Sequence, residues 1–196
     1  MRLHALVADP TKTLPILEVL RDDPSEYVRR FVVNHLNGIA KDHPDLVANI
    51  ARNWMMHASK DREKLIRHAC RSLVKQGHSA TLAVFGVLPP AIGMPQIEIN
   101  PRKVVLGDAL TFDVTFSSTS AKPQKLIIDY AIHHCKANGT LVPKVFKWKQ
   151  STLSSNETRR HPMRPITTRA YCPGDHAVSL RINGQDFGRA QFELEM

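Results

Sequence analysis

The pattern of apolar residues changes near Leu88, and this change divides the chain into two parts that must fold differently. Before it, apolar residues recur at the three- and four-residue spacing of amphipathic helices. After it, they alternate with polar residues as in half-buried strands. The stretch 87–95 between them contains three prolines and a glycine, which neither a helix interior nor a central strand tolerates. We therefore expect two domains, residues 1–93 and 94–196.

The first part contains an internal repeat. Apolar pairs follow one another at four-residue spacing over 27–36, and the same arrangement returns over 65–74. A second helix is expected after each, over 44–54 and 78–85, and a proline opens the first of these. Helix pairs that recur at intervals of about 40 residues are typical of HEAT-like repeats, whose pairs must stack on neighbours. The first part is therefore predicted to be a HEAT-like α-α solenoid fragment.

The second part is typical of β structure. Alternation is clearest over 109–116, and the dipeptides at 138–139 and 183–184 (both Asn-Gly) suit tight hairpin turns. Short strands at regular spacing predict an immunoglobulin-like β-sandwich, with another small antiparallel sandwich or an open barrel as the alternative. The fold class is thus predicted to be multidomain, α then β. The further strands are expected over 97–99, 126–134, 141–148, 176–182 and 187–194.

Basic residues outnumber acidic ones, 27 to 18, and the formal net charge of +9 favours an anionic partner such as nucleic acid. Within 144–169, Lys and Arg predominate and Glu157 is the one acid. Strand alternation would put Lys147 and Lys149 on one face and the aromatic residues beside them on the other. The polar stretch 151–165 is expected to be a loop whose arginines contact phosphates, with a merely solvated loop as the alternative.

In the helical part, Arg67, Arg71 and Lys75 are four residues apart and would form one stripe. Arg29 and Arg30 begin the matching helix of the earlier repeat, so the two sets would line one concave surface; an ordinary solvated helix face is the alternative. The predicted DNA-binding residues are Arg29, Arg30, Arg67, Arg71, Lys75, Lys144, Lys147, Lys149, Arg159, Arg160 and Arg169.

No familiar catalytic motif is present: the sequence has no Gly-rich phosphate loop, no GxSxG and no HExxH. Neighbouring residues in 133–135 (His-His-Cys) would point to opposite faces of a strand, so no metal site is expected. Asp22, Asp23 and Glu26 cluster at a helix start, where they either complement the helix dipole or include a catalytic carboxylate. Trp54 either stacks on a nucleobase or belongs to the core. No cofactor is expected, and the catalytic residues stay unidentified.

Two helical segments resemble the AlkC branch of the HEAT-repeat alkylpurine DNA glycosylases. They are DDPSEYVRRFVVNHLNGIAKDHPDLV at 22–47 and IRHACRSLVKQG at 66–77. The second part is similar to the immunoglobulin-like domain appended to some AlkC proteins. The residues that carry this similarity are Asp129-Tyr130, Pro143-Lys144-Val145-Phe146-Lys147, Thr167-Thr168-Arg169 and Gly174-Asp175-His176.

The resemblance implies a DNA repair protein that grips duplex DNA and, when complete, excises cationic N-alkylated bases such as 3-methyladenine. The charge of the lesion weakens the glycosidic bond, and a carboxylate near the deoxyribose can stabilise the developing oxocarbenium charge. Complete relatives have further helical repeats before the matching region, so we expect this chain alone to lack much of the active site. The DNA contacts that the resemblance carries over are Arg29, Arg30, Arg67, Arg71, Lys144, Lys147 and Arg169.

Three functions remain open: a DNA glycosylase, a non-catalytic DNA-binding module and a protein-interaction scaffold. The expected partner is double-stranded DNA carrying alkylated bases, with self-association through the open end of the helical array as a further expectation. No membrane partner is expected, because no apolar run is long enough to span a bilayer. The three widely spaced cysteines favour a reducing cytoplasm, and a bacterial, nucleoid-associated location fits a DNA partner.

Overall fold

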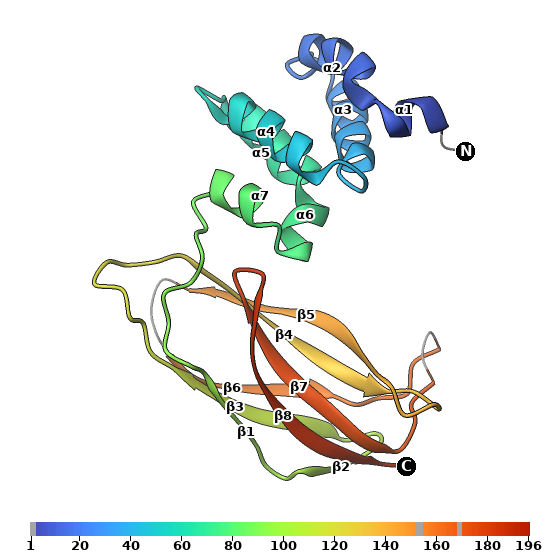
Figure 1. Ribbon diagram of the computed structural model, residues 1–196, viewed down its shortest axis with the longest axis vertical. Coiled ribbons are helices and arrows are strands. Elements are labelled where there is room, and N and C mark those ends of the chain that lie inside the picture. Colours follow the sequence, from blue (N-terminus) through green and yellow to red (C-terminus); the bar gives the residue numbers. More distant parts are fainter. Residues whose placement is uncertain (1–2, 152–154, 168–169) are drawn as a thin grey trace. The chain divides into compact units, whose positions relative to one another are not determined.

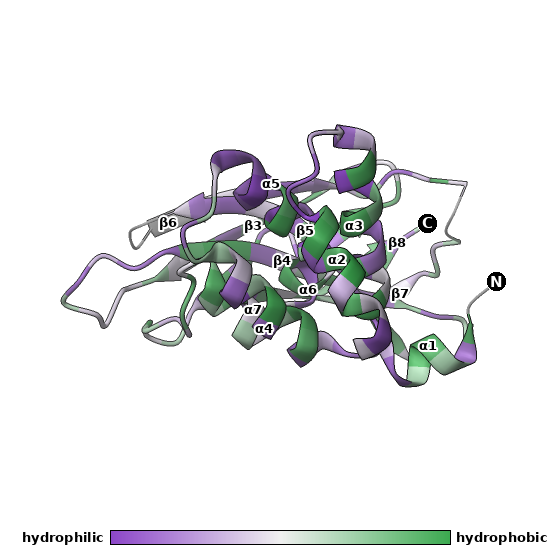
Figure 2. Cartoon of the chain, turned by 90° about the horizontal axis from the view of Figure 1, so that it is seen from above, coloured by the Kyte–Doolittle hydropathy of each residue, from purple (hydrophilic) through white to green (hydrophobic). Residues whose placement is uncertain are grey.

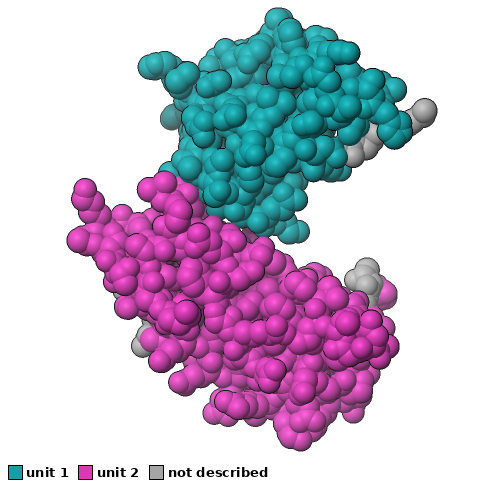
Figure 3. Space-filling view, viewed as in Figure 1, with its two compact units in different colours: residues 1–86 teal, residues 87–196 magenta. Residues whose placement is uncertain are grey.

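The computed structural model describes residues 3–151, 155–167 and 170–196, which form seven α-helices, one 3-10 helix and eight strands (Figure 1). The chain divides into two compact units, Met1–Gly86, here the helical unit, and Val87–Met196, here the β unit (Figure 3). The helices are α1 (His4–Ala8), η1 (Pro10–Thr13), α2 (Leu14–Leu20), α3 (Glu26–Ile39), α4 (Pro44–Met55), α5 (Lys60–Ala69), α6 (Arg71–Gln76) and α7 (Ser79–Val84). The strands are β1 (Gln96–Ile99), β2 (Lys103–Val105), β3 (Ala109–Phe116), β4 (Leu126–Cys135), β5 (Leu141–Ser151), β6 (Ser155–Pro162), β7 (Gly174–Ile182) and β8 (Gln185–Glu195).

Local sequence signals set the starts of the longer helices. Before α3, the Asp23 carboxylate accepts the Ser25 N–H at 2.8 Å and forms a tight turn. Pro44 opens α4, where its fixed φ suits the first helical turn. The Ser59 hydroxyl accepts the Arg62 N–H at 3.2 Å and caps α5. These polar contacts fix where each helix begins, and the apolar faces then decide how the helices pack.

The helical unit has one apolar core, and Trp54 is its largest fully buried side chain. Val32 and Leu36 of α3, Ile66 of α5 and Leu73 of α6 surround this core, and each is at most 2% exposed. Figure 2 shows hydrophobic and hydrophilic residues along the same helices, as expected of helices that bury one side. Burial of these faces is the main stabilising contribution of the unit.

The predicted fold class is wrong. The sequence pattern predicts a HEAT-like α-α solenoid fragment followed by a separate immunoglobulin-like β-sandwich, whereas the described residues form a mixed fold of seven helices and eight strands in two sheets. The helices are unequal: α3 has 14 residues, and α6 and α7 have six each. The helix expected over 65–74 is divided at Cys70. Apolar periodicity identifies a buried face but does not show where a backbone bends.

Asn37 ties α3 to this break between α5 and α6. Its side chain is 8% exposed. The Nδ2 group donates at 3.0 Å to the backbone oxygen of Ala69, the last residue of α5, and at 3.0 Å to the Ser72 hydroxyl. The last carbonyls of a helix have no partner within the helix, so a buried one must find a donor elsewhere. The bend leaves the Ala69 carbonyl without a donor from the helix backbone, and Asn37 stabilises the bend by donating to that carbonyl.

We predict that Asn37→Ala lowers the free energy of unfolding of the chain by about 1–3 kcal/mol, because a buried carbonyl loses its donor. Asn34→Ala, at an exposed position of the same helix, is the matched control and is expected to change stability by less than about 0.5 kcal/mol. Urea denaturation followed by circular dichroism measures both. Equal losses for the two variants would contradict this role of Asn37.

The β unit contains a three-stranded sheet in the order β1-β3-β6 and a five-stranded sheet in the order β2-β8-β7-β4-β5. β2 and β8 run parallel, and the other described pairings are antiparallel. β5 and β6 follow one another in the chain, yet each is an edge strand of a different sheet. β6 lies in the stretch 151–165 that the polar composition predicts to be a loop. That prediction is wrong, because 155–162 pairs along the whole of β3.

Side chains from both sheets meet in one aromatic cluster. The Phe112 ring on β3 lies 5.3 Å from the Tyr130 ring on β4 and 5.9 Å from the Trp148 ring on β5, between centroids. Phe146 stacks on Tyr130 at 5.4 Å. The Tyr130 hydroxyl forms a 2.8 Å hydrogen bond with Nδ1 of His161 on β6. This aromatic cluster, Phe112, Tyr130, Phe146, Trp148 and His161, thus joins β3 and β6 to β4 and β5.

The proline-rich stretch 87–95 is part of the β unit. Asn183, in the turn between β7 and β8, donates from Nδ2 to Leu88 O at 2.7 Å and to Lys125 O at 3.0 Å. The Gln124 side chain accepts from Ala91 N at 2.9 Å and donates to Ala91 O at 2.7 Å. The division into domains 1–93 and 94–196 stays a prediction. None of the described helices is both long enough and apolar enough to span a bilayer.

Candidate nucleic-acid interface

Two of the predicted helical cations lie at the start of α3, and both are already engaged. The Arg29 guanidinium donates to Asp23 O at 2.6 Å and to Pro24 O at 2.9 Å. Arg30 Nη2 lies 3.0 Å from the Glu26 carboxylate, one turn earlier on the same helix. Arg29 therefore stabilises the turn that precedes α3. Arg30 stays largely exposed and is the freer of the two to meet another anion.

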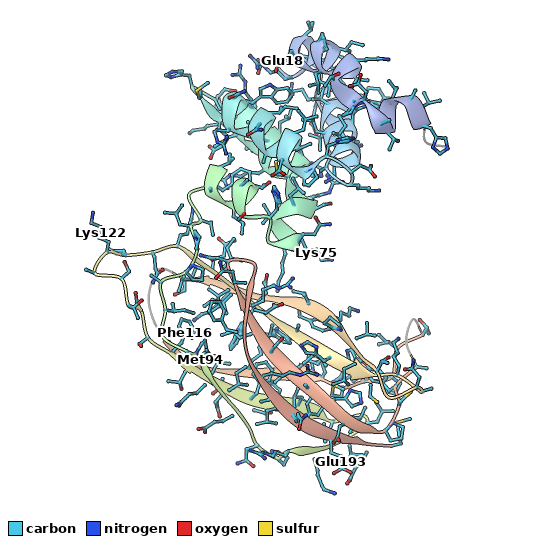
Figure 4. All side chains as sticks on the ribbon, in the orientation of Figure 1. Glu18, Lys75, Met94, Phe116, Lys122 and Glu193 are labelled. Carbon is cyan, nitrogen blue, oxygen red and sulfur yellow. The ribbon has the colours of Figure 1, made fainter. Side chains whose placement is uncertain are left out.

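The predicted stripe of Arg67, Arg71 and Lys75 does not lie on one continuous helix. Cys70 separates α5 from α6, with φ −86° and ψ 2°, so the three cations belong to two helices. Arg67 pairs with Glu63 at 2.9 Å, and the Arg71 guanidinium donates to a backbone carbonyl of the preceding turn at 3.0 Å. Lys75, labelled in Figure 4, is exposed near the end of α6. A single regular cationic stripe is therefore not formed.

A groove of about 440 Å³ runs between α3 and α5, and it brings Arg29 and Arg30 together with a lysine and a histidine that the sequence pattern did not single out. These are Lys64 and His68, which the four-residue count from Arg67 skips. Carboxylates also line the groove and pair with the cations there, so its charge is partly neutralised. The lining residues are Glu26, Arg29, Arg30, Val33, Asp61, Lys64, Leu65 and His68.

The acidic cluster before α3 has structural partners. The Arg62 guanidinium donates to Asp22 at 2.8 Å, and this hydrogen bond holds the pKa of Asp22 below its ordinary value. Asp23 accepts the backbone N–H in its turn, and Glu26 pairs along its helix. Trp54 is buried and its indole N–H donates to Glu18. These contacts support the structural alternatives that the sequence left open for all four residues.

Strand β5 departs from strict alternation at Trp148. Ile128 pairs with Lys149 and Asp129 pairs with Lys147, so β5 has one residue more than β4 at this point. The backbone N–H of Trp148 donates to the Asp129 carboxylate on β4. Because a bulge interrupts the alternation of faces, Lys149 is half-buried opposite Ile128 while Lys147 is exposed. The prediction that the two lysines share one face is therefore wrong.

Lys147 belongs to a row of charges across the five-stranded sheet. Its partner Asp129 on β4 pairs in turn with Arg181 on β7, which donates to Asp186 at 2.7 and 3.0 Å. Burial raises the pKa of Asp129, although the Trp148 N–H and the two neighbouring cations act in the opposite direction. Lys147 is thus the exposed end of a partly compensated charge row.

Two further cations rest on the aromatic cluster. Lys144 pairs opposite the buried Ile132, and its Nζ lies 5.4 Å from the Phe146 ring centroid. On β6, the Arg159 guanidinium lies 5.5 Å from the Tyr130 ring centroid. Both distances are in the range of cation–π attraction, which orders a cation without neutralising it. Lys144 and Arg159 therefore present fixed positive charge beside the rings.

The second arginine of β6, Arg160, lies on the face of the strand opposite to that of Arg159. Arg159 pairs with Phe112 and Arg160 with Thr111, so the two arginines lie on opposite faces of β6. We name the basic side chains along strands β5 and β6 the cationic edge; they are Lys144, Lys147, Lys149, Arg159 and Arg160. These cations lie on several faces and not on one flat surface. The predicted contact Arg169 lies outside the described residues.

The β unit is an immunoglobulin-like domain, as comparison with known families shows. Residues 93–196 match the family model described as the C-terminal Ig-like domain of the uncharacterised protein YhaZ, and the chain belongs to this family. It is 38% identical to YhaZ of Bacillus subtilis (strain 168), over 98% of this chain and 54% of that protein.

The whole chain is also similar to a solved structure. The alkylpurine DNA glycosylase AlkC of Pseudomonas fluorescens, bound to DNA containing an abasic site analog, shares 37% identity with a TM-score of 0.84. The match covers 100% of this chain and 56% of that chain, so the fold is AlkC-like. The chain spans about half the length of these two relatives.

A histidine on the five-stranded sheet offers a probe of the local charge. Burial and then the Arg189 cation lower the pKa of His133, which also bonds the Ser179 hydroxyl at 2.8 Å, while Asp186 acts to raise it. The unfolded chain therefore binds this proton more readily. The contribution of His133 to stability is present above the ordinary histidine pKa and is lost as the pH falls below it.

We predict that Arg189→Gln raises the pKa of His133 toward that of an ordinary histidine, because a nearby positive charge is removed. Arg160→Gln removes the same charge from the three-stranded sheet and is expected to leave this pKa unchanged. NMR titration of the histidine ring protons measures both variants. An unaltered His133 pKa in Arg189→Gln would show that Arg189 does not act on it.

Proposed function

We propose that this chain is part of a DNA alkylation repair protein that binds duplex DNA and that, in the complete protein, excises N-alkylated bases such as 3-methyladenine. The observation that carries the proposal is the match over the whole chain to AlkC in its DNA-bound state. Two cations of the cationic edge, Lys144 and Arg159, support it, because cations that aromatic rings order without neutralising them suit the phosphate backbone. A cytoplasmic, nucleoid-associated location belongs to the same proposal.

The cationic edge is suited to affinity and not to base specificity. Contacts between basic side chains and phosphates fix where a protein lies on a duplex and are largely independent of sequence. Each neutralised phosphate releases counterions, so binding through such contacts weakens steeply as salt rises. Salt-dependent binding of duplex DNA also distinguishes this proposal from a protein-interaction scaffold, because such a scaffold is not expected to bind duplex DNA.

We predict that the chain binds duplex DNA with an affinity that falls steeply with salt, and that replacing Lys144 and Lys147 by Gln weakens binding alike for all sequences. Two lost phosphate contacts would lower the slope of log K against log salt by roughly 0.9 each. Fluorescence anisotropy with two unrelated duplexes over a salt series measures this. Replacing Lys147 together with Arg169 is expected to have the same effect.

The matched control is the pair Lys122→Gln and Lys136→Gln, exposed loop lysines outside the predicted set that remove the same charge. Lys122 projects from the loop between β3 and β4 (Figure 4). The control pair is expected to change the slope less than the pair on β5. If the chain does not bind duplex DNA even at low salt, both the glycosylase and the DNA-binding module are refuted, and the protein-interaction scaffold is the function left.

A non-catalytic DNA-binding module is the second candidate function, and the engaged carboxylates favour it for this chain by itself. Asp22, Asp23 and Glu26 each have a structural partner, so none of them is proposed as a catalytic group. The complete protein would have to supply the carboxylate that stabilises positive charge on the deoxyribose. Tyr27 and Phe31 of α3 are 70% and 59% exposed and support self-association as part of the proposal.

We predict that this chain alone releases little or no 3-methyladenine from alkylated DNA while it still binds the duplex. The reason is that it spans about half of its relatives and has no free carboxylate in the acidic cluster. Chromatography of bases released from alkylated DNA gives the rate, with heat-released base as the positive control. Robust turnover by the chain would contradict this prediction and favour the glycosylase over the binding module.

A further inference from the structure

A second basic region lies on the β unit, at the edge of β8 where β2 no longer covers it. The groove there has a volume of about 390 Å³. Both of its charged lining residues are arginines, and no carboxylate of the described chain lines it. Neither arginine lies in the basic stretch 144–169. The lining residues are Ile97, Ile99, Arg102, Arg189, Ala190 and Gln191.

The two arginines of this groove are uncompensated. Their guanidinium groups have no ion pair or hydrogen bond within the residues that the structure describes. The neighbouring carboxylates are already used, because Lys103 Nζ lies 3.1 Å from both Glu193 and Glu195. Glu193 is labelled on β8 in Figure 4. Arg102 and Arg189 thus keep their full charge in a groove that already excludes acidic side chains.

The exposed edge of β8 adds neutral donors to the groove. β2 pairs with β8 only over 193–195, and the Glu193 N–H donates to Arg102 O at 2.8 Å. In a strand, every second N–H points to the same edge, so the Gln191 N–H points to the side that Glu193 uses. The side-chain amide of Gln191 also lines the groove. A bound anion would therefore meet both charged and uncharged donors.

Gly188 lies on β8 next to β1, at one end of the groove. Its φ is 57°, in the left-handed region that glycine adopts without cost. A Cβ at this position would lie 3.4 Å from Pro95 O and 3.4 Å from Ile97 Cδ1. These are ordinary contact distances, so it is the backbone conformation that favours glycine here, and Ile97 forms an apolar wall of the groove that Arg189 also lines.

We propose that this groove binds a phosphate of the DNA backbone. Guanidinium groups donate two parallel hydrogen bonds to phosphate oxygens, and an oxyanion gains most from cations that have no carboxylate partner. The proposal rests on the proposed function and adds to it a phosphate site on β8, which β7 and β4 separate from the β5 part of the cationic edge. Arg102, Arg189 and Gln191 are its binding residues.

The test is the binding of a duplex by the full chain carrying Arg102→Gln and Arg189→Gln, measured by fluorescence anisotropy over a salt series. We expect a several-fold rise in Kd at low salt and a slope of log K against log salt that falls by about 1–2, as for one or two lost phosphate contacts. The pair Lys122→Gln and Lys136→Gln is the charge-matched control. Circular dichroism verifies that both proteins are folded.

Each outcome supports or refutes the proposal that the groove binds a DNA phosphate. A double variant that behaves like the control pair overturns it, and the proposed function then stands if the unmodified chain keeps a steep salt dependence. Absence of duplex binding by the unmodified chain overturns both.

A second readout needs no variant. Duplex DNA should raise the pKa of His133 in the unmodified chain, because a bound phosphate offsets Arg189. If inorganic phosphate raises this pKa and the duplex does not, the groove binds small anions only and the DNA site is refuted.

Discussion

The hydrogen bond between the Tyr130 hydroxyl and His161 is the contact on which the arrangement of the β unit depends. It crosses from the five-stranded to the three-stranded sheet and fixes β6, a strand of polar composition, against the aromatic cluster. Phe146 and Tyr130 can then hold Lys144 and Arg159 over their faces. Apolar burial and the ordering of cations are thus achieved by the same rings. Phosphate binding at the cationic edge would follow from packing in the core.

Much of the β unit was predictable because its strands bury one face. Alternation over 109–116 places Leu110, Phe112, Val114 and Phe116 inward, and all four are buried. β6 escaped prediction because its polar residues become a strand only through pairing with β3, a contact distant in sequence. The bulge at Trp148 depends likewise on Asp129, which accepts the backbone N–H of Trp148. The residue pattern within a segment does not show which distant residues that segment will contact, so these two features could not be predicted from it.

In the candidate site, too, some features could be predicted from the sequence and others depend on contacts between distant residues. Basic residues concentrated in 144–160 were found from charge alone, but their faces were not, since a bulge and a cross-sheet hydrogen bond decide them. Arg102 and Arg189 could not be found from the sequence, because they are far apart in the chain and only the approach of β1 to β8 brings them to one groove. In the helical unit, the division of a predicted helix at Cys70 separated cations that even spacing had joined.

Hydrogen–deuterium exchange of the full chain, with and without duplex DNA, tests most directly whether the β unit meets the nucleic acid through its basic side chains. Backbone amides of edge strands exchange readily unless something covers them. DNA is expected to slow exchange in β5 and β6, while the buried central strands β4 and β7 change little. Slower exchange confined to other segments, with β5 and β6 unaffected at a DNA concentration that saturates binding, would contradict the account.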